Sequence, residues 1–130
     1  MPSILFVCVA NSCRSQMAEA AAKRYAKGQW DIWSSGSHPS GRVHPAAVSA
    51  MQELGISLVG HYSKGLNEVP QQLWDYVVTM GCGDNCPTVR AKNRLDWQIP
   101  DPVSLPPEEA RQVRDLIISQ VRQLLDKASP

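Results

Sequence analysis

The chain has 130 residues, of which 43% are hydrophobic and 19% are charged, and this suits one globular domain over residues 1–130 with a single core. Because the formal net charge is only +1 and no run of Lys or Arg occurs, we expect neither a nucleic acid nor a membrane surface as the main partner. No apolar run approaches the roughly 20 residues of a membrane span and no signal-peptide pattern is present, so we expect a cytoplasmic protein, with a monomer as the default. Four cysteines then indicate thiol chemistry or a metal site before structural disulfides.

The first half of the chain alternates strand and helix patterns. Residues 3–8 predict a strand buried on both faces, because their apolar side chains run without alternation. Small apolar residues then recur at helical spacing from Ser15, and this helix is predicted to end near residues 27–28. Residues 30–35 predict the second strand. A second helix is predicted from Pro45, with an inner face formed by Val48, Met51 and Leu54.

The second half continues the alternation. Leu73 and Trp74 predict a short helix that leads into a third strand over residues 76–80, and residues 94–98 predict a short fourth strand. A last helix is predicted from Pro107, with acidic residues in its first turn. Its buried stripe is expected to contain Val113, Leu116, Ile117, Val121, Leu124 and Leu125.

This alternation predicts an α/β fold, an open parallel four-stranded sheet with helices on both faces, similar to the Rossmann arrangement. In such a sheet, ligands bind beyond the carboxyl ends of the strands, where the chain order reverses. Cys8 ends the first predicted strand, and Cys82 follows the third. We therefore expect the functional site at this edge of the sheet.

The most informative motif is Cys8 followed after five residues by Arg14, where a strand passes into a helix. If this loop wraps around the thiol, its backbone N–H groups and the positive helix end form a site for a tetrahedral oxyanion. Arg14 would add a two-pronged contact, and the same surroundings favour a thiolate at Cys8, with Ser15 as a further hydrogen-bond donor. The alternative is a purely structural cysteine that packs in the core at the end of a strand. The predicted binding residues are Val9, Ala10, Asn11, Ser12, Cys13 and Arg14.

The same motif, together with the downstream pair Asp101-Pro102, resembles the low-molecular-weight protein tyrosine phosphatase family. More narrowly, several segments resemble the arsenate reductases built on that fold: residues 8–19, residues 78–83, Cys86-Pro87 and Asp96-Trp97. The resemblance covers nearly the whole chain. It implies that the first and third strands are neighbours, so that the sulfur atoms of Cys8 and Cys82 can meet.

Electron counting then separates the two activities that this family performs. Arsenic(V) accepts two electrons from a pair of thiols and leaves as arsenic(III), whereas phosphorus(V) is not reduced. The reductase interpretation has Cys8 attack arsenate, Asp101 protonate the departing oxygen and Cys82 attack the Cys8 sulfur. Cys86 then attacks Cys82 and carries the disulfide to a thioredoxin-like reductant, with glutathione and glutaredoxin as the alternative. No bound cofactor is expected.

The main rival interpretation is a tyrosine or small-molecule phosphatase that forms a phosphocysteine on Cys8, with Arg14 and Asp101 in the same roles. The phosphatases of the family carry aromatic residues after Asp-Pro, whereas here residues 103–105 are Val, Ser and Leu. Weak hydrolysis of aryl phosphates is expected in either case, because the loop is shared. A third interpretation is an oxyanion or redox sensor that does not turn over.

For several single residues, a role outside the proposed catalysis is also possible on sequence grounds. Cys82 and Cys86 have the spacing of two zinc ligands, although no second close pair accompanies them. Cys86 is alternatively a bystander, with an external thiol resolving the adduct at Cys82. Asp101 is alternatively a turn residue before proline. Asn11 is expected to shape the loop and Cys13 to be structural. No role in catalysis is assigned to His38, His44 or His61.

One departure from the family concerns a cation site. Some relatives have a carboxylate after the serine that is Ser63 here, and it helps to hold a monovalent cation beside the anion loop. This chain has Lys64 instead. We expect its ammonium group to replace the cation, next to Asn11, Glu19 and Ser35.

Overall fold

The computed structural model describes residues 1–81 and 89–128. Strands, α-helices and two short 3-10 turns alternate along these residues. In chain order they are β1 (Ser3–Cys8), α1 (Arg14–Ala26), β2 (Asp31–Gly36), α2 (Pro45–Gln52), η1 (Leu66–Glu68), β3 (Trp74–Thr79), β4 (Ala91–Asp96), η3 (Pro102–Ser104) and α3 (Pro107–Lys127).

The four strands form one parallel sheet in the order β2-β1-β3-β4. β1 is central, and its Leu5 is in register with Trp33 of β2 and Val77 of β3. Every residue of β1 is buried, as expected of a parallel strand that is covered on both faces. The predicted fold class and the predicted pairing of the first and third strands are confirmed.

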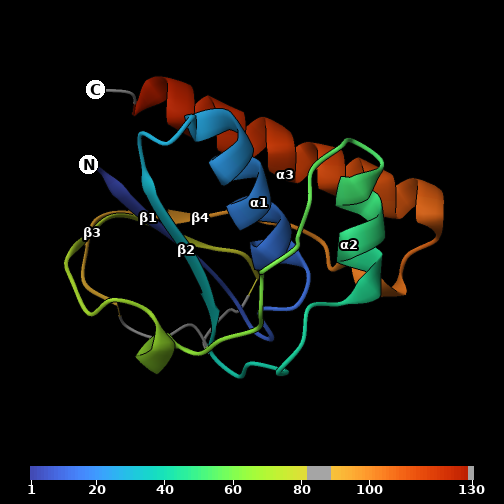
Figure 1. The fold of residues 1–130 in the computed structure, drawn as a ribbon, viewed down its shortest axis with the longest axis horizontal. Coiled ribbons are helices and arrows are strands. Elements are labelled where there is room, and N and C mark those ends of the chain that lie inside the picture. The colour runs from blue at the N-terminus through green and yellow to red at the C-terminus, as the bar shows by residue number, and fades with distance from the viewer. Residues whose placement is uncertain (82–88, 129–130) are drawn as a thin grey trace.

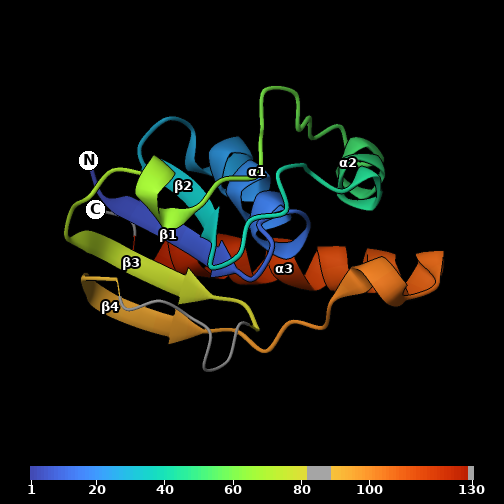
Figure 2. The same ribbon diagram turned by 90° about the horizontal axis from the view of Figure 1, so that it is seen from below.

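The two faces of the sheet are covered differently (Figures 1 and 2). On one face, Ile4 and Phe6 pack with buried residues of α1, α2 and α3. On the other, Leu5 and Val7 pack with Trp74 and with residues around the turn η1. Figure 1 shows α1 and α3 side by side along one side of the sheet, with η1 on the opposite side. Alternate side chains of one strand therefore enter two separate hydrophobic clusters.

Two predictions about element type and extent were wrong. The predicted short helix at Leu73 and Trp74 is absent, because Trp74 already pairs with Ala91 as the first residue of β3 and is almost completely buried. β4 begins at Ala91, three residues before the predicted start at residue 94. Most of its side chains are polar and exposed, so this edge strand shows no hydrophobic pattern in the sequence.

Two predicted helix faces also need correction. In α2, Ala47 and Met51 are buried, whereas Val48 and Leu54 are exposed, because the two-turn helix contacts the core through one narrow stripe. In α3, Leu116 is exposed, and Ile118 is buried in addition to the other predicted positions. None of the described helices is long and apolar enough to cross a membrane.

Gly36, at the end of β2, allows a close approach to the loop that follows β1. A Cβ atom at Gly36 would lie 2.6 Å from the carbonyl oxygen of Val9 and 3.0 Å from the amide nitrogen of Asn11. Both are backbone atoms, so the loop itself would have to move. The glycine at the end of β2 therefore determines how closely the loop packs on the sheet.

We expect Gly36→Ala to lower the free energy of unfolding by about 2 kcal/mol, the usual cost of overpacking, in denaturant titrations. The matched control is Gly65→Ala, whose Cβ would meet only side-chain atoms of Asn67 and Pro39 at 3.2 Å or more. It loses the same unfolded-state entropy, so it should be clearly less destabilised. Equal stability of the two variants would contradict this role of Gly36.

Candidate active site

The loop between β1 and α1 turns its carbonyl groups outward. N–H groups of the following segment and two side chains donate hydrogen bonds to them at 2.8–3.2 Å. The carbonyls and their donors are Cys8 with Ser37, Val9 with His38, Ala10 with Ser40 and Ser63, Asn11 with Gln16, and Ser12 with His44. Within residues 1–81 and 89–128, the backbone N–H groups of residues 9–14 have no protein acceptor. Unpaired N–H groups at the start of a helix are the arrangement that binds anions in proteins.

Asn11 is the centre of this loop. Its backbone is left-handed, with φ of 49°, a conformation that asparagine tolerates better than most residues. Its Oδ1 accepts hydrogen bonds from the backbone N–H of Lys64 and from Nε2 of Gln16, both at 2.9 Å. Its Nδ2 donates to the hydroxyl oxygens of Ser15 at 2.8 Å and Ser34 at 3.0 Å. The expectation that Asn11 shapes the loop agrees with these contacts.

Ser15 connects Asn11 to the sulfur of Cys8. The Ser15 Oγ and Cys8 Sγ atoms are 2.8 Å apart, and both residues are buried. Because Asn11 donates to the Ser15 oxygen, the single hydroxyl proton of Ser15 is free to point at the sulfur. In this arrangement the Ser15 hydroxyl is the donor and the Cys8 sulfur is the acceptor.

Arg14 lies at the edge of the loop, on the side of β3. Its Nη1 donates a hydrogen bond to the carbonyl of Ile99 at 3.0 Å. A Cβ atom at Gly81 would clash with the same guanidinium group, and Gly81 also has a φ of 84°. Because Met80 N donates to Val7 O at 2.8 Å, the chain reaches Gly81 directly beside the end of β1. The residue that precedes Cys82 therefore lies against Arg14.

The remaining acid of the site is Asp101, and the remaining thiol is Cys13. Asp101 is exposed, and its Oδ1 accepts a hydrogen bond from Val103 N at 3.1 Å as the cap of η3. The turn role of Asp101 is thus present, and its role as general acid stays a prediction. Burial, together with the charges of Asp101 and Cys8, raises the pKa of the Cys13 thiol to about 12. Cys13 is therefore a neutral thiol at physiological pH.

Sequence reasoning missed part of the support behind the loop. The hydroxyl that contacts Asn11 and Glu19 belongs to Ser34, whereas the expected partner Ser35 has a buried oxygen without a hydrogen-bond partner among the described residues. Gln16, fully buried, donates to both oxygens of Asn11 and to the carbonyl of Tyr62. The expectation of Ser35 was therefore wrong by one residue, because adjacent strand residues face opposite sides of the sheet and it is Ser34 that faces α1.

The predicted relay residues Cys82 and Cys86 lie outside the described residues, and so does the alternative zinc pair that they would form. Among the residues that are described, no group of three or more His, Cys, Asp or Glu side chains is arranged to hold a metal ion. The described site therefore consists of an anion loop, a buried thiol with a hydroxyl partner, and one arginine.

The comparisons with known proteins can now be set beside this geometry. The model of the family described as "Low molecular weight phosphotyrosine protein phosphatase" matches residues 3–129. The chain belongs to this family. Within the low molecular weight phosphatase family, a protein of Synechocystis sp. named "Glutaredoxin arsenate reductase" is 38% identical, with 99% of this chain and 100% of the relative covered.

Solved structures of the family agree closely with the fold. "An arsenate reductase in the phosphate binding state" has a TM-score of 0.90 and 39% identity, with 99% of this chain and 100% of that chain covered. A thioredoxin-dependent arsenate reductase of Corynebacterium glutamicum has a TM-score of 0.80 and 32% identity, with 98% and 61% covered. The low molecular weight phosphatase fold of this chain is therefore shared with relatives that carry the name of a reductase.

The raised pKa of Cys13 generates a prediction about reactivity. Cys8 and Cys13 are equally buried, at 3% and 4% exposure, so exposure does not distinguish them. At pH 8 a thiol with a pKa of about 12 is ionised in only about one molecule in ten thousand. We expect iodoacetamide to alkylate Cys8 at least about a hundredfold faster than Cys13 in the native protein, as measured by peptide mass.

The control is the same labelling in guanidinium chloride, where both thiols are exposed and should react at similar rates. Native labelling of Cys13 at the rate of Cys8 would show that the loop does not keep the Cys13 thiol neutral.

Proposed function

We propose that this chain is an arsenate reductase that uses a relay of three cysteines. The observation that carries the proposal is the loop after Cys8, whose N–H groups lack acceptors among the described residues, together with Gly81, the residue before Cys82, which lies against Arg14 of the same loop. Relatives and structural neighbours that are named arsenate reductases support the same reaction. The loop alone fits phosphate as well as arsenate, so the second thiol is the decisive part.

In the proposed first step, the loop amides and Arg14 hold arsenate while the Cys8 thiolate attacks arsenic. A sulfur–arsenic bond forms, and one oxygen leaves after Asp101 has given it a proton. Ser15 stabilises the thiolate before the attack through the 2.8 Å contact with the sulfur. The loop amides and the Arg14 guanidinium thus act on one small anion, and binding and nucleophile activation share the same groups.

In the second step, the Cys82 thiolate attacks the sulfur of Cys8. A Cys8–Cys82 disulfide forms and the sulfur–arsenic bond breaks, so its electron pair reduces arsenic(V) to arsenic(III), which leaves as arsenite. Cys86 then attacks Cys82 and releases Cys8 as a thiolate. Two thiols have been oxidised and two electrons have gone to arsenic, so an external dithiol must reduce the Cys82–Cys86 disulfide in each cycle.

For the reductant we propose a thioredoxin-like protein. The thioredoxin-dependent relative of C. glutamicum supports this choice, whereas the Synechocystis relative carries a name that points to glutaredoxin. A chain with its own second and third thiols gives a dithiol reductant a complete disulfide to attack. If Cys86 is a bystander, glutathione with glutaredoxin would have to resolve the adduct at Cys82 instead.

A phosphatase is the second candidate, because the family is described by that activity and the anion loop serves both reactions. It would use Cys8, Arg14 and Asp101 and would need neither Cys82 nor Cys86. The exposed residue after Asp101-Pro102 is Val103, which offers no aromatic wall for an aryl substrate. We therefore expect aryl phosphate hydrolysis only as a weak side activity.

The test is to mix the fully reduced protein with arsenate, count the free thiols and map the disulfides by peptide mass. The wild type should lose two thiols and contain a Cys82–Cys86 disulfide. Cys86→Ser should trap a Cys8–Cys82 disulfide, and Cys82→Ser should contain no disulfide at Cys8. Phosphate is the matched control anion: it fits the loop but takes no electrons, so it should leave all thiols free.

The same samples separate the rival functions. Recovery of the thiols and continued arsenite release with thioredoxin, but not with glutathione and glutaredoxin, would support the proposed reductant. Aryl phosphate turnover without arsenate-driven thiol loss would make the protein a phosphatase. A single loss of thiols without turnover under both reducing systems would make it a sensor.

A further inference from the structure

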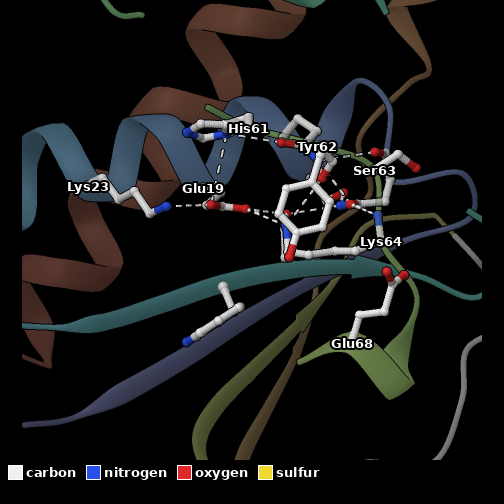
Figure 3. Close-up of polar contacts among 12 residues, drawn as sticks. Glu19, Lys23, His61, Tyr62, Ser63, Lys64 and Glu68 are labelled. Atoms are coloured by element: carbon white, nitrogen blue, oxygen red, sulfur yellow. Dashed lines mark hydrogen bonds and ion pairs between the residues drawn. The ribbon is translucent and has the colours of Figure 1, made fainter. Parts of the chain in front are cut away.

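The two sides of the anion loop are supported differently. Figure 3 shows the polar contacts on one side, where Lys64 reaches Glu19 of α1. On the same side, Ser63 Oγ donates a hydrogen bond to the carbonyl of Ala10 at 2.9 Å. On the side of β3, Arg14 is the one charged residue of the loop, and its side chain donates a single hydrogen bond within the described part of the chain. The orientation of Arg14 therefore depends on the few groups next to it.

Two groups next to Arg14 form a narrow slot, which we call the guanidinium slot. One is the carbonyl of Ile99, which accepts a hydrogen bond from Arg14 Nη1 at 3.0 Å. The other is Gly81, because a Cβ atom there would clash with Nη1 and would lie 3.4 Å from Cζ of the same arginine. That Cβ atom would also lie 3.7 Å from the oxygen of Ile99. The guanidinium group therefore occupies the space that a side chain at residue 81 would need.

The sheet fixes both walls of the guanidinium slot. Met80 N donates to Val7 O at 2.8 Å, which pairs the chain just before the first wall with the central strand β1. Trp97 N donates to Thr79 O at 2.9 Å, which holds the segment of the second wall beside the end of β3. The side chain of Ile99 is also buried in the core, at 4% exposure. The walls are thus anchored by backbone pairing and by burial, independently of the arginine between them.

The guanidinium slot uses one nitrogen of Arg14 and leaves the other two available. A guanidinium group has five N–H bonds in a rigid plane, and among the described residues only Nη1 has an acceptor. Nε and Nη2 therefore keep the pair of parallel N–H bonds that binds two oxygens of a tetrahedral anion. In a mobile arginine this pair would have to be ordered during binding, and that ordering costs affinity.

We propose that Gly81 is a positioning residue, which together with the carbonyl of Ile99 holds Arg14 in its binding orientation before the oxyanion arrives. Gly81 acts through Arg14 and takes no part in the bonds to the anion. The inference rests on the anion site of the proposed function and not on the reduction step. Gly81 also has a left-handed backbone, with φ of 84°, so a test has to separate backbone strain from loss of the slot.

Gly28 provides the matched control for backbone strain. It has a left-handed backbone too, with φ of 77°, but a Cβ atom there would meet no described atom within 4 Å. It follows the end of α1 that is opposite to Arg14. Alanine at either glycine should lower the free energy of unfolding, whereas only Gly81→Ala displaces the guanidinium group. Gly81→Asn is a second variant, because asparagine tolerates the left-handed backbone but still carries a Cβ atom.

The first measurement is the NMR order parameter of the Arg14 Nε–H bond in the protein without phosphate. The wild type and Gly28→Ala should give a value like that of a rigid backbone, about 0.85, because the guanidinium slot holds the side chain. Gly81→Ala and Gly81→Asn should give values below about 0.6, which are typical of a flexible group.

The second measurement is the dissociation constant of inorganic phosphate, from an NMR titration that also reaches millimolar affinities. Both Gly81 variants should bind phosphate about tenfold more weakly, the upper end of what ordering one long side chain costs, and Gly28→Ala should bind it as the wild type does. In an Arg14→Met background, Gly81→Ala should cause no further loss, because the group through which it acts is gone.

Four outcomes would overturn the inference. They are a flexible Arg14 Nε–H bond in the phosphate-free wild type, an unchanged phosphate affinity of the Gly81 variants, an equal loss in Gly28→Ala, and a full further loss in the Arg14→Met background. If neither Gly81 variant folds, the order parameter of the wild type still decides whether Arg14 is held in advance. Because phosphate takes no electrons, a protein that passes these tests but does not reduce arsenate would refute the proposed function alone.

Discussion

The site depends on one backbone conformation, the left-handed turn at Asn11, and on the hydrogen bonds that hold it. With φ at 49°, the loop turns so that its carbonyl groups accept hydrogen bonds from the surrounding segments, whereas its N–H groups find no acceptor among the described residues. This arrangement is costly in isolation, because several like dipoles converge and a non-glycine residue is left-handed. The side-chain amide of Asn11 offsets that cost through hydrogen bonds to Ser15, Ser34 and the backbone of Lys64.

The fold provides rigid supports for that turn from three directions. β1 and β2 end side by side, and Gly36 lets the loop lie directly on the end of β2. α1 starts at Arg14 and buries Ser15, Gln16 and Glu19, which are polar residues on a face that would otherwise be apolar. The end of β3 brings Gly81 beside Arg14. Burial of polar side chains in α1 is therefore explained by the site and not by the core.

Sequence patterns predicted the elements whose local signals agree with their surroundings. The apolar run of β1, the Cys8 to Arg14 loop and the start of α3 at Pro107 were all predicted, because hydrophobicity, capping and motif spacing point the same way there. The start of β4 was predicted three residues too late, because an edge strand with exposed Lys92 and Arg94 lacks an apolar pattern. Trp74 was wrongly assigned to a helix, because a single large apolar residue shows neither helical nor strand periodicity. The choice between Ser34 and Ser35 depends on the facing of adjacent strand residues, which only the register determines.

The most direct test of the account is the dissociation constant of phosphate for Asn11→Gly, measured by calorimetry against the wild type. Glycine adopts the left-handed conformation without strain, so this variant removes the amide and its hydrogen bonds but not the permitted turn. The account predicts that affinity falls by about tenfold or more, because nothing then ties the loop to Ser15, Ser34 and Lys64. An affinity equal to that of the wild type would contradict it and would mean that backbone conformation alone forms the anion site.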